Sequence, residues 1–150
     1  MTDKLKFKIG LSGTYSGDKT PEYKIAVNGH EYVHGTIKTA SGVTEFFEFE
    51  ADLPDGDCSL DISLLNKTNS DVIKDNYNDP DNFKIIGDLL LNIDSIEIDD
   101  IDIGNLKYTA SKYQPFDGRD LVKNCVNLGW NGTYSVGFTT PFYIWLLENL

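Results

Sequence analysis

The chain has 150 residues, which is enough for one well-formed hydrophobic core and leaves little room for a second. Its 24 acidic and 13 basic residues give a formal net charge of -11, and such a charge repels the phosphates of a nucleic acid. No apolar run approaches the roughly 20 residues that span a bilayer, and the first residues lack the apolar segment of a secretion signal. We therefore expect a single domain over residues 1–150, with no nucleic-acid partner, no membrane insertion and no secretion signal.

Alternating apolar and polar residues predict β-strands along most of the chain. Val, Ile, Thr, Tyr and Phe recur throughout, and these residues favour strands over helices. The expected strands cover residues 5–11, 22–27, 31–39, 43–51, 58–64, 89–103, 126–130, 133–138 and 142–147.

Two Asn-Gly dipeptides, Asn28-Gly29 and Asn131-Gly132, fall between pairs of these expected strands. An Asn-Gly pair readily takes the positive φ angles that a two-residue hairpin turn requires. The sequence therefore predicts two tight hairpins.

The apolar alternation changes parity twice in the stretch 89–103. Ile93 and Ile96 are an odd number of residues apart, and Ile101 returns to the parity of Ile93. Because side chains alternate between the two faces of a strand, this pattern predicts a bulge near Ser95 and a break near Asp99.

These segments give about nine or ten strands and no helix longer than a turn or two. A single sheet of that size would leave an apolar face in water, whereas two stacked sheets bury it. The predicted fold is all-β, an antiparallel, jelly-roll-like β-sandwich.

Most of the acidic residues lie between residues 48 and 102, with only Lys67, Lys74 and Lys84 as basic partners. The irregular segment 66–87 is rich in Asn and Asp, and the oxygen atoms of these residues are the ligands that calcium prefers. A solvated acidic face is the alternative interpretation.

Three tyrosines, Tyr15, Tyr77 and Tyr113, fall in expected loops, where an exposed ring offers an apolar face to a sugar. Motifs for nucleophilic catalysis are missing from the sequence, and a glycosidase would need two carboxylates facing each other across a cleft. We expect no enzymatic activity. Cys58 and Cys125 are either two free thiols, as is usual without secretion, or one disulfide.

Residues 64–71 and 88–98, separated by a loop, resemble the calcium-dependent, xylan-binding type of carbohydrate-binding module, with a likeness that extends over residues 4–104. In that family a strand ending in Asn leads into an acidic calcium loop, and the chain returns on a strand that carries an Asp. The resemblance implies a calcium ion bound by Asp71, Asp88 and Asp94, although Asp88 is two residues from the position expected for the family. The expected ligand-binding residues are Asn66, Asn69, Tyr15, Tyr77 and Tyr113.

Residues 46–50, 91–101, 127–133 and 141–150 resemble small virion structural proteins of marine tailed phages. This resemblance implies a virion component that is assembled in the host cytoplasm and contacts other virion proteins, polysaccharide or further copies of itself. Our first hypothesis is therefore a non-catalytic virion structural protein, a decoration or fibre-associated module with a sandwich like that of a carbohydrate-binding module. The alternative is a free calcium-dependent carbohydrate-binding module that recognises a plant or cell-surface polysaccharide.

Overall fold

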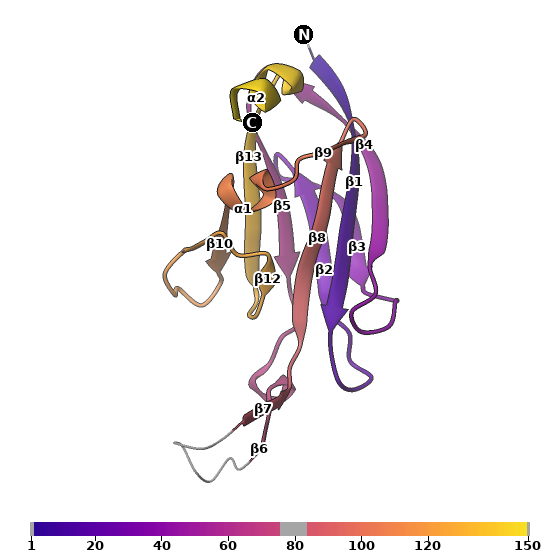
Figure 1. The fold of residues 1–150 in the computed structure, drawn as a ribbon, viewed down its shortest axis with the longest axis vertical. Coiled ribbons are helices and arrows are strands. Elements are labelled where there is room, and N and C mark those ends of the chain that lie inside the picture. Colours follow the sequence, from indigo (N-terminus) through magenta and orange to yellow (C-terminus); the bar gives the residue numbers. More distant parts are fainter. Residues whose placement is uncertain (1, 76–83, 150) are drawn as a thin grey trace.

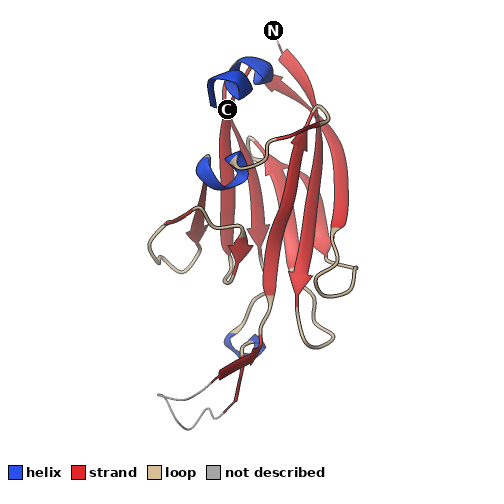
Figure 2. Ribbon diagram, viewed as in Figure 1, coloured by secondary structure: helices blue, strands red, loops and turns tan. Residues whose placement is uncertain are grey.

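The structure is a computed structural model that describes residues 2–75 and 84–149. Two antiparallel sheets face each other and form a β-sandwich, with short helices at its periphery (Figures 1 and 2). The predicted all-β sandwich is thus confirmed.

The first sheet has the strand order β12-β8-β1-β4, with β9 paired to the end of β8. Its longest strand, β1, lies between β4 and β8 and is antiparallel to both. The bounds of these strands are β1 Thr2–Thr14, β4 Glu45–Pro54, β8 Leu90–Ile98, β9 Ile101–Asp102 and β12 Asn127–Leu128.

The second sheet has the strand order β11-β10-β13-β5-β2-β3. The bounds of these strands are β2 Glu22–Val27, β3 His30–Thr36, β5 Gly56–Leu64, β10 Ser111–Pro115, β11 Val122–Lys123 and β13 Gly132–Thr140. The pairing of β5 with β13 runs over nine residues and joins the middle and the end of the chain.

The two ends of the sandwich differ. At one end, which we call the loop end, the β1–β2 loop lies near the connection from β5 to β8, and a two-stranded ribbon of β6 (Ile73–Asp75) and β7 (Lys84–Gly87) projects from it (Figure 1). A single 3-10 turn, η1 (Asn69–Asp71), precedes β6. The opposite end carries α2 (Phe142–Asn149), while α1 (Leu106–Thr109) connects β9 to β10.

The core lies between the sheets and follows the predicted alternation. Leu5, Phe7, Ile9 and Leu11 from β1 are all buried and face the buried apolar residues of the second sheet. Each such side chain stabilises the fold by about 1.5–3 kcal/mol through removal of apolar surface from water. Cys58 is buried, Cys125 is half-buried, and both are free thiols.

The first predicted hairpin is confirmed, because Asn28 and Gly29 have φ angles of 51° and 80° and join β2 to β3. The parity change in β8 is a bulge. Gly10 pairs with Ser95 and Leu11 with Ile93, so that Asp94 has no partner on β1.

Two predictions for the C-terminal region are wrong. Residues 142–147 form the first part of helix α2 instead of a strand. Asn131 and Gly132 do not form a hairpin turn, because β12 pairs with β8 in the first sheet while β13 lies in the second. Within the described part of the chain, no helix has the length and apolar character needed to cross a bilayer.

Candidate functional site

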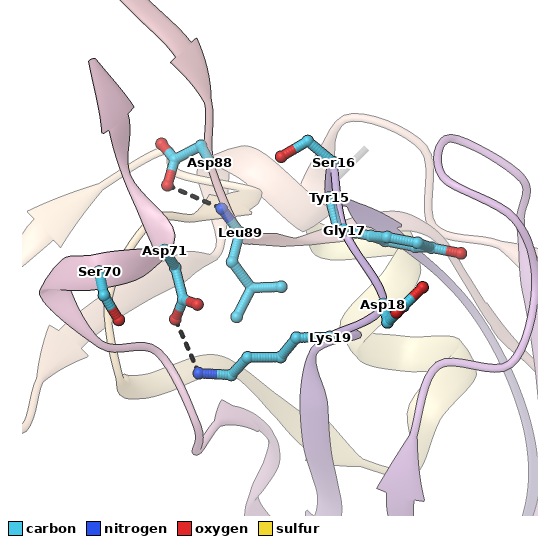
Figure 3. Close-up of a pocket in the computed structure, with 9 residues that line it drawn as sticks. All are labelled: Tyr15, Ser16, Gly17, Asp18, Lys19, Ser70, Asp71, Asp88 and Leu89. Carbon is cyan, nitrogen blue, oxygen red and sulfur yellow. Dashed lines mark hydrogen bonds and ion pairs between the residues drawn. The ribbon is translucent and has the colours of Figure 1, made fainter.

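A pocket at the loop end is formed where the β1–β2 loop meets the segments just before β6 and β8 (Figure 3). The pocket has a volume of about 140 Å³. We call it the loop-end pocket, and it is lined by Tyr15, Ser16, Gly17, Asp18, Lys19, Ser70, Asp71, Asp88 and Leu89.

Asp71 is held at the wall of this pocket by two neighbouring segments. Its Oδ2 accepts hydrogen bonds from the Lys19 ammonium at 2.8 Å and from the Thr68 backbone N–H at 2.7 Å. Burial alone would raise the pKa of Asp71, but the hydrogen bonds from Lys19 and Thr68 outweigh it and hold the pKa below the usual value. Asp71 is therefore a carboxylate at neutral pH that ties η1 to the β1–β2 loop.

Asp88 makes its ion pair with Lys67, whose side chain is only 1% exposed. The Lys67 ammonium also donates to the Leu89 carbonyl oxygen at 2.7 Å. Asn131 holds the backbone of the same lysine, since its Oδ1 accepts from the Lys67 N–H at 2.7 Å and its Nδ2 donates to the Lys67 carbonyl oxygen at 2.9 Å. Lys67 thus joins three distant segments of the chain, one of which carries the lining residues Asp88 and Leu89.

Asn66 attaches the same segment to the start of β2. Its Oδ1 accepts from the Glu22 N–H at 2.8 Å, and its Nδ2 donates to the Thr20 carbonyl oxygen at 3.0 Å. Asn69 is exposed and begins η1. Asn66 thus contacts the residue after Lys19, and Asn69 directly precedes Ser70, so both asparagines adjoin the pocket lining.

Tyr15 is a lining residue of the pocket and directly follows β1. Its hydroxyl donates to the Thr39 carbonyl oxygen at 2.7 Å, and its backbone N–H donates to the Ser41 Oγ at 3.1 Å. Figure 3 shows the Tyr15 side chain directed away from Asp71, with the hydroxyl at its far end.

The structure brings together five of the eight residues that the sequence singled out. Tyr15, Asp71 and Asp88 line the pocket, and Asn66 and Asn69 adjoin it. Their roles in binding stay predictions.

The other three do not join this group. Asp94 lies in the bulge of β8, where its Oδ2 accepts from the Thr44 hydroxyl at 2.9 Å. Tyr113 lies in β10, is 4% exposed and donates its hydroxyl to the Trp130 carbonyl, so its interpretation as an exposed loop tyrosine is wrong. Tyr77 falls outside the described residues.

The three carboxylates proposed for calcium do not fit a calcium ion as they stand. Asp71 and Asp88 are each already paired with a lysine ammonium. Asp94 lies roughly 13 Å along β8 from Leu90, the residue that comes directly after Leu89 of the pocket lining. Calcium takes six to eight oxygen ligands. Residues 2–75 and 84–149 contain no group of three His, Cys, Asp or Glu side chains that could hold a metal.

Sequence reasoning did not identify Lys19 or Lys67 as members of the site. The signal for Lys67 was its position as one of very few basic residues in an acidic segment. Its burial could not be read from that position.

No protein-family model and no curated protein sequence matches the chain. Two solved structures are similar in fold. The first is the selenomethionine form of vCBM60, described in connection with a circular permutation that links two families of calcium-dependent carbohydrate-binding modules. It has a TM-score of 0.57 and 10% identity, and the match covers 89% of this chain and 90% of that one.

The second is vCBM60 in complex with galactobiose, with a TM-score of 0.54, 12% identity and coverage of 88% of this chain and 97% of that one. At such low identity the likeness concerns the fold. The chain has a β-sandwich of the kind found in these carbohydrate-binding modules.

Proposed function

We propose that this chain is a non-catalytic carbohydrate-binding module that contacts its sugar at the loop-end pocket. The observation that carries the proposal is the match of nearly the whole sandwich to a module that binds galactobiose. The pocket adds a place on this fold that is lined by several polar side chains and by Tyr15.

The chemistry of the lining suits a sugar. A sugar presents hydroxyl groups, which donate and accept hydrogen bonds, and a less polar C–H face. Asp18 and Asp71 offer carboxylate acceptors, Lys19 offers an ammonium donor, and the Tyr15 ring offers an apolar surface.

The size of the pocket limits what it can hold. Its volume of about 140 Å³ is well below the roughly 300–1,000 Å³ of sites for drug-sized ligands. One sugar ring of a longer chain therefore fits better than a whole oligosaccharide. We expect weak binding, with a Kd near about 1 mM, which corresponds to about −4.1 kcal/mol.

Galactose-containing oligosaccharides are the first ligands to test, because the similar structure binds galactobiose, and xylan is the second, because of the sequence resemblance. Isothermal titration calorimetry and electrophoresis through polysaccharide gels measure the affinity. Tyr15→Ala and Asp18→Asn should each weaken binding about tenfold, or about 1.4 kcal/mol.

Asp55→Asn is the matched control, since Asp55 is an exposed carboxylate between β4 and β5, at the end opposite the pocket. It should bind as the unchanged chain does. Absence of binding to every glycan tested, or equal binding by all the variants, would refute the proposal.

A location on a phage particle remains our proposal for where the module acts. It is supported by the resemblance of four segments to virion proteins and by the exposed apolar side chains of Tyr143, Ile144 and Leu147 on α2, which an assembly partner could cover. Mass spectrometry of purified particles tests it, and particles that lack the chain would contradict it.

A further inference from the structure

The buried ion pair of Lys67 lies where the sequence resemblance places a calcium ion. That resemblance puts calcium between the strand that ends near Asn66 and the strand that begins after Asp88. The structure fills this place with the Lys67 ammonium, which bonds to the Asp88 carboxylate and to the Leu89 carbonyl oxygen.

The two oxygen atoms around this ammonium belong to the groups that also bind calcium in proteins, a carboxylate and a backbone carbonyl. The lysine side chain is 1% exposed, so its charge is shielded little by water. A calcium ion that approached Asp88 would meet the positive charge of Lys67 at close range, and this repulsion opposes binding.

We propose that the Lys67 ammonium takes the place of a calcium ion at the loop end, so that the loop-end pocket keeps its shape without metal. The ammonium links the end of β5 to the start of β8, and Asn131 links the Lys67 backbone to the start of β13. This role of Lys67 shows in stability and in the response to metal, neither of which requires that the pocket bind a sugar.

Thermal unfolding of the full chain in chelator, in calcium and in magnesium tests the metal response. A calcium site with a Kd of about 10 μM would raise Tm by roughly 7–15 °C at about 5 mM calcium. We expect no rise in calcium beyond that in magnesium. A calcium-specific rise that disappears in Asp71→Asn or in Asp88→Asn, with both variants folded by circular dichroism, would overturn the proposal.

A double-mutant cycle tests the role of the ammonium. Lys67→Met keeps most of the side-chain volume but leaves Asp88 without its partner, which should lower Tm by roughly 6–20 °C. Lys67→Met combined with Asp88→Asn removes both charges and should recover part of that loss. Lys19→Met, at the exposed ion pair of the same pocket, should change Tm by no more than about 4 °C.

The result that contradicts the proposal is a double variant no more stable than Lys67→Met. That outcome would mean that Lys67 acts through packing and not through its charge. The comparison holds even when Lys67→Met fails to fold, because the double variant is then expected to regain a cooperative transition.

Discussion

Replacing Phe142 with alanine should separate α2 from the end of the sandwich. Phe142 is the first residue of α2 and is only 1% exposed. Its ring packs against Trp145 with centroids 5.9 Å apart and against Phe138 of β13 at 6.5 Å. Its contact with Phe138 makes it one of the side chains that anchor the helix to the second sheet.

The magnitude follows from that burial. Truncation of a buried Phe to Ala costs about 3–5 kcal/mol, because the transfer free energy of the ring is lost and a cavity is left in its place. For a domain of this size, about 1 kcal/mol lowers Tm by roughly 2–4 °C. We therefore expect Phe142→Ala to lower Tm by roughly 6–20 °C.

Differential scanning calorimetry and urea unfolding measure this change. Leu147→Ala is the matched control on the same helix, because Leu147 is 76% exposed, and it should change the free energy of unfolding by less than about 0.5 kcal/mol. Equal effects of the two substitutions would refute the position of α2.

Three further results are expected. Gly132→Ala should destabilise the fold by about 1–3 kcal/mol in urea unfolding, because a Cβ there would lie 2.5 Å from a backbone oxygen of β10. Gly137→Ala is the control and should be nearly neutral, because no atom lies within 4 Å of a Cβ at that position. Equal effects of the two substitutions would contradict this packing. Hydrogen bonds outweigh burial and depress the pKa of Asp71 in the folded protein. The ionised Asp71 therefore contributes to the free energy of unfolding above its ordinary pKa of 3.8, and this contribution is lost as the pH falls through the lower pKa of the folded state. Asp71→Asn should therefore weaken the acid dependence of unfolding below about pH 5, and an unchanged pH profile would contradict the assignment. A thiol reagent should label Cys125 in the native protein and Cys58 only after unfolding. If neither cysteine is labelled in the unfolded, unreduced chain, the two form a disulfide.

The local alternation of side chains was enough to predict the sandwich. A strand with one buried face needs an apolar residue at every second position, and Phe7 and Ile9 in β1 meet that rule. The same rule located the bulge in β8, because both Ile93 and Ile96 must reach the core and only an extra residue between them permits it. These features depend on residues that are neighbours in the chain, so they can be predicted from the sequence.

Pairing between distant segments was decided by the tertiary structure. Asn131 precedes a glycine, as in a hairpin turn, yet its side chain bonds to the Lys67 backbone while the chain crosses from one sheet to the other. The run 142–147 is apolar at nearly every position and fits a buried strand as well as a short helix. Packing on the end of the sandwich selected the helix.

The loop-end site combines both kinds of information. The order of residues alone shows that Asp and Asn gather between β5 and β8, and the family resemblance pointed to Asp71 and Asp88 among them. The partners of these carboxylates, Lys19 and Lys67, lie 52 and 21 residues away along the chain and were found only in the folded molecule. The physical reason is that the favoured partner of a charge depends on burial and distance in three dimensions, which the spacing of residues along the chain does not specify.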